Sequence, residues 1–322
     1  MIKDGIVYVD NTTLKQVARC SSETVLRAIL GWTTQEEKAT LLSGSAGHEA
    51  LASYFRAQAR GHGKDVCIDT GMHKLEHEYK EWAEAEVPED DRLGWPNVRA
   101  IVAEWMETRW GRLPFQFKHP DDVEVGFAYP LDEEGEFVFY GRMDGKAYHL
   151  MDDSWVVAEH KFTGNMSPFW VRQWKLDSQV TGYLWAAQQH YGDVSGVMIN
   201  AIELGKLPSS ERQCRTHGML YSKCSLQHVK AQLIGPITRT PEQFEEWRLT
   251  ALMLARKYKE LSEVYTTIEH LPYVRMTGCF SGACRLCDFY DFCSLGRPVH
   301  AIPTMLKYAP WRPFIPNTEE GK

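Results

Sequence analysis

The spacing of apolar and polar residues changes along the chain, and each spacing predicts a kind of element. In the first third, apolar residues recur at three- and four-residue intervals, which predicts amphipathic helices within 11–60 and over 74–85 and 97–110. Short apolar runs at 137–140 and 155–158 then predict buried strands in an antiparallel meander. The chain therefore begins with helices and continues into a sheet.

The second half alternates between helical and strand-like segments. A helix is expected over 171–191, and a longer one over 241–265 that Thr240 would cap. Strands are expected at 194–202, 212–222 and 227–236. This order of elements predicts the α/β fold class, with a mixed central sheet flanked by helices.

The pattern divides the chain into three expected parts. These are a helical N-terminal part (1–120), a core (121–265) and a cysteine-rich region with a tail (266–322). The tail contains an aromatic and basic run at 308–314, which either stacks on nucleobases or packs its rings on the body of the protein.

Composition narrows the class of protein. The 322 residues are 43% hydrophobic and 25% charged, which is typical of a soluble globular protein. The net charge of −7 argues against a protein that coats nucleic acid without specificity. It does not exclude a local cationic groove, and it omits the charge of a bound metal. No run approaches the roughly 18 apolar residues of a membrane span. Residues 1–10 lack the apolar centre of a signal peptide. We therefore expect no membrane partner and a cytoplasmic location.

Three residues near the ends of adjacent predicted strands suggest chemistry. Asp144 ends one strand, and Glu159 and Lys161 end the next. Because side chains at i and i+2 of a strand point the same way, Glu159 and Lys161 would face the same space. Carboxylates can bind Mg²⁺ or Mn²⁺ for phosphodiester hydrolysis, and a lysine can orient water or stabilise negative charge. Taken alone, the three residues fit a turn-forming aspartate and a solvated Glu–Lys pair better than a catalytic site.

The surrounding motifs change that balance. The segment 44–51 has the form G-x-x-x-H-x-x-L with His48, and a Q-x-x-x-Y motif follows at Gln179 and Tyr183. With G-x-x-D ending at Asp144 and E-x-K ending at Lys161, four motifs occur in order. This ordered set resembles the RecB-like branch of the PD-(D/E)XK nuclease superfamily. The resemblance covers roughly residues 10–295 and implies a restriction-endonuclease-like sheet in the core.

The resemblance also implies a role for each residue. His48, Asp144, Glu159 and the backbone carbonyl of His160 would bind the metal, and Lys161 would be the catalytic lysine. Gln179 and Tyr183, one helical turn apart, would line the site and touch DNA. Further candidates near the site are Arg142, for substrate binding, and Glu124, whereas Glu49 is interpreted as a helix-surface residue. The implied activity is divalent-metal-dependent hydrolysis of DNA, by an exonuclease that prefers single strands.

A group of cysteines near the C-terminus suggests a second metal centre. Cys284, Cys287 and Cys293 have the form C-x2-C-x5-C, which suits zinc or an iron–sulfur cluster, and Cys20 is the best candidate for a fourth ligand. One cysteine before the core and three after it resemble the iron–sulfur nucleases of the same superfamily, such as the AddB nuclease domain and CRISPR-associated single-strand exonucleases. The resemblance implies a [4Fe–4S] cluster that cross-links a long loop.

One alternative remains open for this centre and two for the function. Ser21 follows Cys20 where that family usually has proline, and Cys279 could complete a local zinc site with the three C-terminal cysteines. Cys67, Cys214 and Cys224 have no partner spacing and suit buried positions.

The chain could also be a DNA-binding module that does not cut, or a subunit active only in a helicase, recombination or CRISPR-adaptation complex of a prokaryotic or phage-infected cell.

Overall fold

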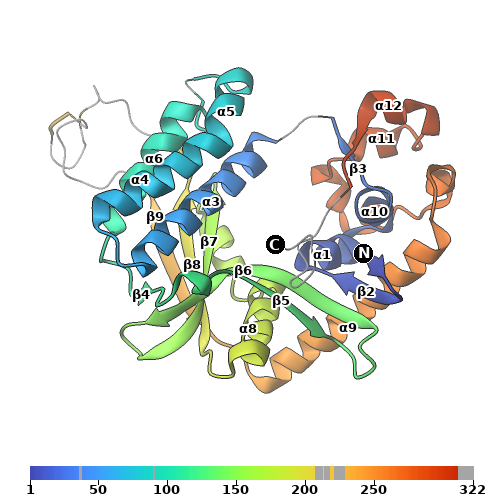
Figure 1. The fold of residues 1–322 in the computed structure, drawn as a ribbon. Helices are drawn as coiled ribbons and strands as arrows, with labels where there is room; N and C mark the ends of the chain where they lie inside the picture. Colours follow the sequence, from blue (N-terminus) through green and yellow to red (C-terminus); the bar gives the residue numbers. More distant parts are fainter. Residues whose placement is uncertain (36–37, 90, 207–212, 214–217, 221–228, 311–322) are drawn as a thin grey trace.

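A computed structural model describes residues 1–322 except 36–37, 90, 207–212, 214–217, 221–228 and 311–322. Its centre is a mixed sheet with helices on both faces (Figure 1), so the α/β fold class is confirmed. The strands of this sheet are β1 (Ile2–Lys3), β2 (Ile6–Val9), β4 (Phe115–Gln116), β5 (Val123–Pro130), β6 (Phe137–His149), β7 (Ser154–Thr163), β8 (Gly196–Glu203) and β9 (Ala231–Ile237).

The long strand β6 organises the sheet. One edge of β6 pairs with β5 in antiparallel register along residues 138–145. On the opposite edge, β2 runs parallel to residues 137–139 and β7 runs antiparallel to residues 145–149. On this edge, residues 140–144 of β6, which include Asp144, therefore lie in a gap between the part paired with β2 and the part paired with β7. Beyond this point β7 continues beside β8, in parallel register, and β9 closes the sheet in antiparallel register.

Two apolar cores lie on the two faces of the sheet. One contains Val156 and Ala158 of β7 and is covered by α3 (Ala39–Ala59), α4 (Lys64–Leu75), α5 (Glu81–Glu86) and α6 (Trp95–Arg109). The other contains Val157 and is covered by α1 (Asn11–Arg19), α8 (Ser178–Tyr191) and α9 (Pro241–Val264). Successive β7 residues thus enter opposite cores, as expected for a strand buried on both faces.

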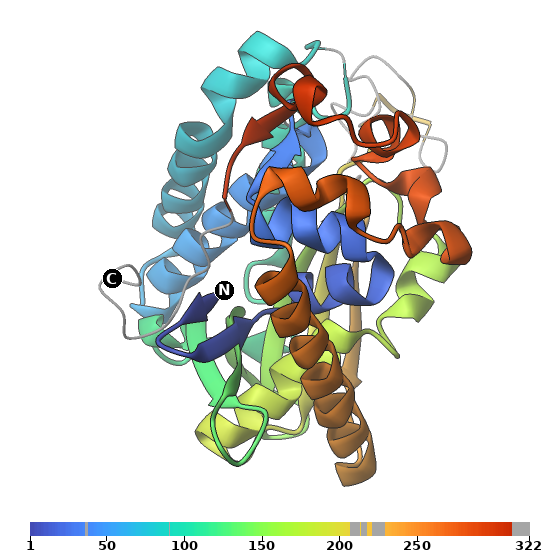
Figure 2. The same ribbon diagram turned by 90° about the vertical axis from the view of Figure 1, so that its right-hand side faces the viewer.

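A third, smaller core joins the two ends of the chain. It contains Val25 and Leu26 of the π-helix η1 (Thr24–Ile29) together with Phe289, Phe292 and other C-terminal residues. Figure 2 shows the red C-terminal segments against the blue N-terminal helices. Here β3 (Trp32–Thr34) pairs with β10 (Leu306–Tyr308) in antiparallel register. The remaining elements of this region are α2 (Ser21–Glu23), η5 (Ile268–Tyr273), α10 (Gly278–Ser281), η6 (Ala283–Leu286), α11 (Tyr290–Ser294), η7 (Val299–Ala301) and α12 (Ile302–Met305).

Most of the predicted elements are confirmed. The helix expected at 74–85 is the end of a longer run formed by α4, η2 (Glu76–Lys80) and α5. The helix predicted over 241–265 is α9, and Thr240 caps it through a reciprocal bond pair with Gln243. The strand expected at 227–236 is β9, whereas most of 212–222 lies outside the described residues.

The prediction of one helix over 171–191 is wrong. The segment holds a short helix, α7 (Pro168–Gln173), and then α8. Asp177 separates them because its backbone is extended and its side chain accepts a hydrogen bond from the N–H of Gln179, which starts a new helix. The division into three parts stays a prediction. Within the described ranges, no helix is both long enough and apolar enough to cross a bilayer.

Candidate active site

The separation of β2 and β7 along β6 creates the candidate site. Asp144 lies where β7 leaves β6, and its Oδ2 accepts a hydrogen bond of 2.6 Å from the backbone N–H of His160 on β7. The Asp144 side chain therefore links the two strands just past the end of their pairing. This geometry leaves its other oxygen, Oδ1, directed toward α3, where His48 Nδ1 lies 3.1 Å away.

One pocket brings the residues predicted from sequence together. It has a volume of about 300 Å³ and draws its walls from α3, β5, β6, β7 and α8. The predicted residues that line it are His48, Arg142, Asp144, Glu159, Lys161, Gln179 and Tyr183. They come from positions up to 135 residues apart, counted from His48 to Tyr183, so only the fold unites them. Their assigned roles stay predictions.

Glu159, Lys161 and Gln179 form a closed triangle of hydrogen bonds. Lys161 Nζ donates to Glu159 Oε1 over 2.6 Å and to Gln179 Oε1 over 3.0 Å. Gln179 Nε2 in turn donates to Glu159 Oε1 over 2.9 Å. An ammonium has three N–H donors, and these contacts use two of them. The triangle thus fixes the lysine while one donor can still serve a substrate or a water.

Burial and charge shift the acid–base properties of the site. Burial and the neighbouring charge of Asp144 raise the pKa of Glu159 to about 7. Burial also acts to raise the pKa of Asp144, but His48, His160 and Lys161 together outweigh it and hold that pKa below its usual value. At Lys161 burial acts to lower the pKa, but Glu159 and Asp144 outweigh it, so the pKa is raised. The two carboxylates repel each other, and a bound cation would remove this repulsion.

The donor atoms around the pocket suit a hard divalent cation. Among the described residues, Glu159 Oε2 is a buried oxygen without a hydrogen-bond partner. Such an atom is costly unless a ligand pairs with it, and carboxylate oxygens are the ligands that Mg²⁺ and Mn²⁺ prefer. Within the described ranges, no three His, Cys, Asp or Glu side chains stand closely enough to enclose a metal ion. The donors therefore fit the ion chemically and line the pocket without forming a finished site.

Arg142 lines the pocket beside two glutamates, Glu124 and Glu49. Its Nε lies 2.5 Å from Glu124 Oε2, and its Nη2 lies 3.9 Å from Glu49 Oε1. Glu124 has a left-handed backbone with φ of 62°, which is unusual for a residue other than glycine. Burial and the charge of Asp144 raise the pKa of Glu124 to about 7. Strained residues often occur at functional sites, which agrees with a place for Glu124 beside Asp144.

His160 takes part in the site through its backbone. Its ring is buried away from the pocket, stacked on Phe55 with centroids 5.1 Å apart. Asn200 Nδ2 lies 3.0 Å from the ring Nδ1. Burial lowers the pKa of His160 to about 4, so the ring is neutral at pH 7. This placement leaves the backbone carbonyl as the group for metal binding, which stays a prediction.

Sequence reasoning missed two residues at this site and misplaced a third. Ser45 lines the pocket one turn before His48, and no motif drew attention to it. Trp174 lies under Lys161, with the Nζ 5.4 Å from its ring centroid. Glu49 was interpreted as a helix-surface residue, but it lines the pocket and faces Arg142. Its position next to His48 on the same helix was the available signal.

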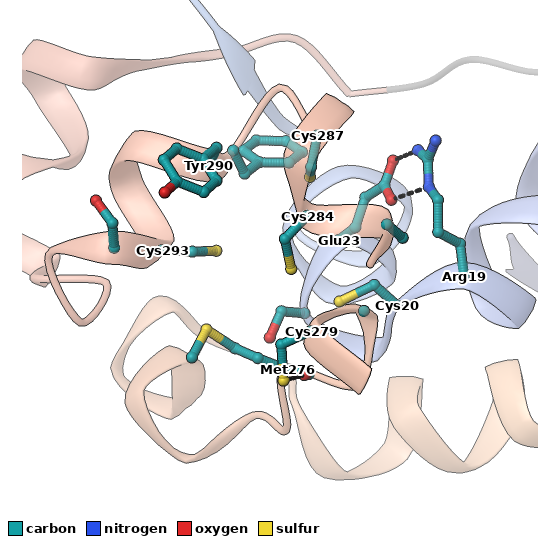
Figure 3. A pocket seen from close by; sticks show the side chains of 14 residues that line it. Arg19, Cys20, Glu23, Met276, Cys279, Cys284, Cys287, Tyr290 and Cys293 are labelled. Atoms are coloured by element: carbon teal, nitrogen blue, oxygen red, sulfur yellow. Dashed lines mark hydrogen bonds and ion pairs between the residues drawn. The ribbon is translucent and has the colours of Figure 1, made fainter. Parts of the chain in front are cut away.

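A second pocket, the cysteine pocket, lies in the third core. It has a volume of about 260 Å³ and is lined by Cys20, Cys279, Cys284, Cys287 and Cys293. In Figure 3, Cys20, Cys284 and Cys293 point into a common space, and Cys279 lies at its lower edge beside Met276. The structure therefore brings Cys20 to the three C-terminal cysteines across more than 260 residues of sequence.

Gly278 is part of the reason the thiols can approach each other. A Cβ at this position would lie 3.3 Å from the Cys20 Sγ and 3.5 Å from the Cys284 Sγ, so both sulfur atoms flank the same point. The N–H of Ser21 also donates to Thr277 Oγ1 over 2.9 Å, which ties the start of α2 to α10. Cys67 is buried in the first core, as expected, and Cys214 and Cys224 lie outside the described residues.

Comparison with known proteins adds little to this geometry. No protein-family model matches the chain, and no curated protein matches it significantly. Among solved structures, the chain is similar to a protein from Eubacterium rectale described as a "putative exonuclease", with 14% identity, a TM-score of 0.45 and coverage of 80% of this chain and 82% of that chain. It is also similar to the protein SSO0001, with 14% identity, a TM-score of 0.32 and coverage of 88% and 95%. The assignment of the site therefore rests on its own geometry.

Proposed function

We propose that this chain is a divalent-metal-dependent nuclease that hydrolyses DNA phosphodiester bonds, as an exonuclease that prefers single strands. One observation carries the proposal: Asp144, Glu159 and Lys161 converge with His48 and Gln179 on one pocket, where a buried Glu159 oxygen has no partner among the described residues. Two carboxylates and a lysine in this arrangement suit metal-assisted phosphodiester hydrolysis. The preference for ends and single strands comes only from the resemblance of the motifs.

Each side chain has a proposed task. Asp144, Glu159, His48 and the backbone carbonyl of His160 would hold the ion. A bound Mg²⁺ or Mn²⁺ supplies a Lewis acid that polarises the phosphate and acidifies a water. Lys161 stays protonated because its pKa is raised, so its remaining N–H can donate to the attacking water or to a phosphate oxygen. Gln179 holds Lys161 and Glu159 in register, and Tyr183 and Arg142 line the path of the substrate.

The test is cleavage of end-labelled single- and double-stranded DNA with Mg²⁺, Mn²⁺ or EDTA. We expect cleavage by the anaerobically purified protein only with metal, and a loss of at least ~10²-fold in rate for Lys161→Ala, as is usual when one catalytic group is removed. Lys80→Ala, which alters a half-buried lysine on η2 that does not line the pocket, is the matched control and should cut normally. If wild type and Lys161→Ala are equally inert on every substrate, the proposal of an independent nuclease fails.

We also infer that the cysteine pocket holds a [4Fe–4S] cluster. Thiolates are the usual ligands of such clusters, and the approach of Cys20 to three cysteines from the other end of the chain supplies the number needed. A pocket of about 260 Å³ is generous for a single zinc ion, whose bonds to sulfur measure about 2.3 Å, and suits a cluster of several atoms. Iron, sulfide and zinc contents of the anaerobic protein distinguish the two metals.

One feature supports the alternative of a subunit that works inside a complex. Phe280, directly after Cys279, and Leu286, directly before Cys287, expose 93% and 91% of their surface. Large apolar side chains that project from a surface often contact another protein. If the isolated chain is inert but a partner that co-purifies with it restores metal-dependent cleavage, the subunit alternative replaces the independent nuclease.

A further inference from the structure

The cysteine pocket contains one thiol more than a cluster of this kind requires. A [4Fe–4S] cluster takes four cysteines, and Cys20, Cys284, Cys287 and Cys293 supply them. The pocket wall nevertheless includes a fifth cysteine, Cys279, which is exposed. This inference rests on the proposed iron–sulfur cluster and concerns what the fifth thiol does.

Cys279 lies at the rim of the pocket on the short helix α10. Its Sγ donates to the carbonyl oxygen of Met276 over 2.9 Å, which holds it at the edge of the space that the other sulfurs face (Figure 3). The preceding residue, Gly278, directly adjoins the Cys20 and Cys284 sulfurs.

Cys279 lies on a very short helix and its thiol makes one weak hydrogen bond. Helix α10 has only four residues and ends at Gly282, whose φ of 73° turns the chain into η6. A Cβ at Gly282 would meet nothing within 4 Å, so open space surrounds this side of the turn. The hydrogen bond that holds the Cys279 thiol is of a weak kind, because S–H is a poor donor. A small rotation of α10 would therefore exchange this bond for a bond to iron.

We propose that Cys279 is an alternative iron ligand that takes the place of Cys284. The two cysteines lie five residues apart within α10 and η6, whereas Cys287 follows the end of η6, Cys293 lies in α11 and Cys20 comes from the other end of the chain. In the exchange, the Cys279 thiol loses its proton as its sulfur binds iron, and Cys284 leaves as a thiolate that takes up a proton. The exchange needs no oxidant or reductant.

Alanine substitutions of the cysteines test the proposal through iron and sulfide content and the visible absorption of the anaerobic protein. We expect Cys20→Ala, Cys287→Ala and Cys293→Ala each to lose most of the cluster. Cys279→Ala and Cys284→Ala should each keep most of it, and the double variant Cys279→Ala/Cys284→Ala should lose it. The proposal is overturned if Cys284→Ala alone loses as much cluster as the double variant, or if the double variant keeps it.

Alkylation of the thiols gives a second readout that does not depend on activity. In the wild type with its cluster, exposed Cys279 should react with iodoacetamide, and mass spectrometry should locate the label there. In Cys284→Ala, Cys279 should be protected while the cluster is present and reactive after iron is removed. Equal labelling of Cys279 in both proteins would contradict the exchange. A wild type without iron would overturn the cluster itself, whatever the outcome of the DNA cleavage test.

Discussion

The ring of Phe162 fills the space that a side chain at Gly47 would need. A Cβ at Gly47 would lie 2.4 Å from Phe162 Cζ, closer than real atoms approach. Phe162 also makes an edge-on contact with the ring of His48, with centroids 5.7 Å apart. The glycine therefore lets α3 approach β7 closely enough for His48 to reach Asp144.

Substitution of Gly47 should lower activity by displacing Phe162 and His48, and not by weakening the helix. In Gly47→Ala the added methyl group must displace the ring of Phe162, and with it the ring of His48 that Phe162 contacts. A shift of about 1 Å at a site can cost on the order of 10²-fold in rate. Gly44→Ala is the matched control on the same helix, because a Cβ there meets nothing within 4 Å. It should keep activity and gain roughly 0.5–1 kcal/mol of stability. Thermal unfolding and DNA cleavage measure both variants, and equal activity of the two would contradict the steric argument.

Removal of one carboxylate should abolish metal binding. In the wild type, Mn²⁺ at about 100 times its Kd should stabilise the folded protein by about 2.7 kcal/mol, and the melting temperature should rise. Glu159→Gln keeps the shape of the side chain but removes the charge that faces the cation, so the Mn²⁺-dependent rise should vanish. Glu84→Gln, an exposed change on α5, should keep it. A full Mn²⁺ response in Glu159→Gln would remove this residue from the set of metal ligands.

Trp174 should affect the rate through Lys161. Its ring faces the ammonium, and a cation–π contact of this kind is worth about 0.5–2 kcal/mol, which corresponds to roughly 2- to 30-fold in rate. Trp174→Leu should lower kcat by that factor with little change in KM, and Trp174→Phe should recover part of the loss. Steady-state cleavage measures both constants. A change in KM alone, or identical kcat values for Leu and Phe, would mean that Trp174 does not position the lysine.

Loss of the cluster should loosen the third core and leave the sheet intact. The cysteine pocket belongs to a small core of its own, whereas β6, β7 and β8 lie between the two large ones. Hydrogen exchange followed by mass spectrometry should show faster exchange at 20–29 and 276–297 after iron is removed, with unchanged exchange in β7. Faster exchange throughout the sheet would show that the cluster supports the whole fold.

Local patterns were sufficient for most elements and for choosing seven residues that the fold brings together in one pocket. Strand runs and helix caps depend on neighbouring residues, so segments such as α9 with its Thr240 cap could be predicted. The break between α7 and α8 could not, because the Asp177 cap lies inside an otherwise continuous helical pattern. The same holds for the glycines of α3. The motif contains Gly44, but the packing of α3 against Phe162 depends on Gly47.

Contacts between distant segments were beyond sequence reasoning. Nothing in the spacing of residues indicates that Trp174 lies under Lys161, or that Glu49 faces Arg142, because both contacts depend on how α7 and α3 meet the sheet. The separation of β2 and β7 around Asp144 is likewise a property of strand pairing. Such features require the fold, whereas the identity of the acids and the lysine does not.

The pairing of Cys20 with cysteines near the other end of the chain sets an order of events during synthesis. The ribosome adds on the order of 5–20 residues per second, so the 273 residues that follow Cys20, up to and including Cys293, take roughly 14–55 s to appear. The strands β6, β7 and β8, with the whole candidate active site, emerge before the last cysteine. The pocket with its acids and lysine can thus assemble before the last cysteine is made. If the cysteine pocket holds the proposed cluster, delivery of iron becomes the final step of maturation.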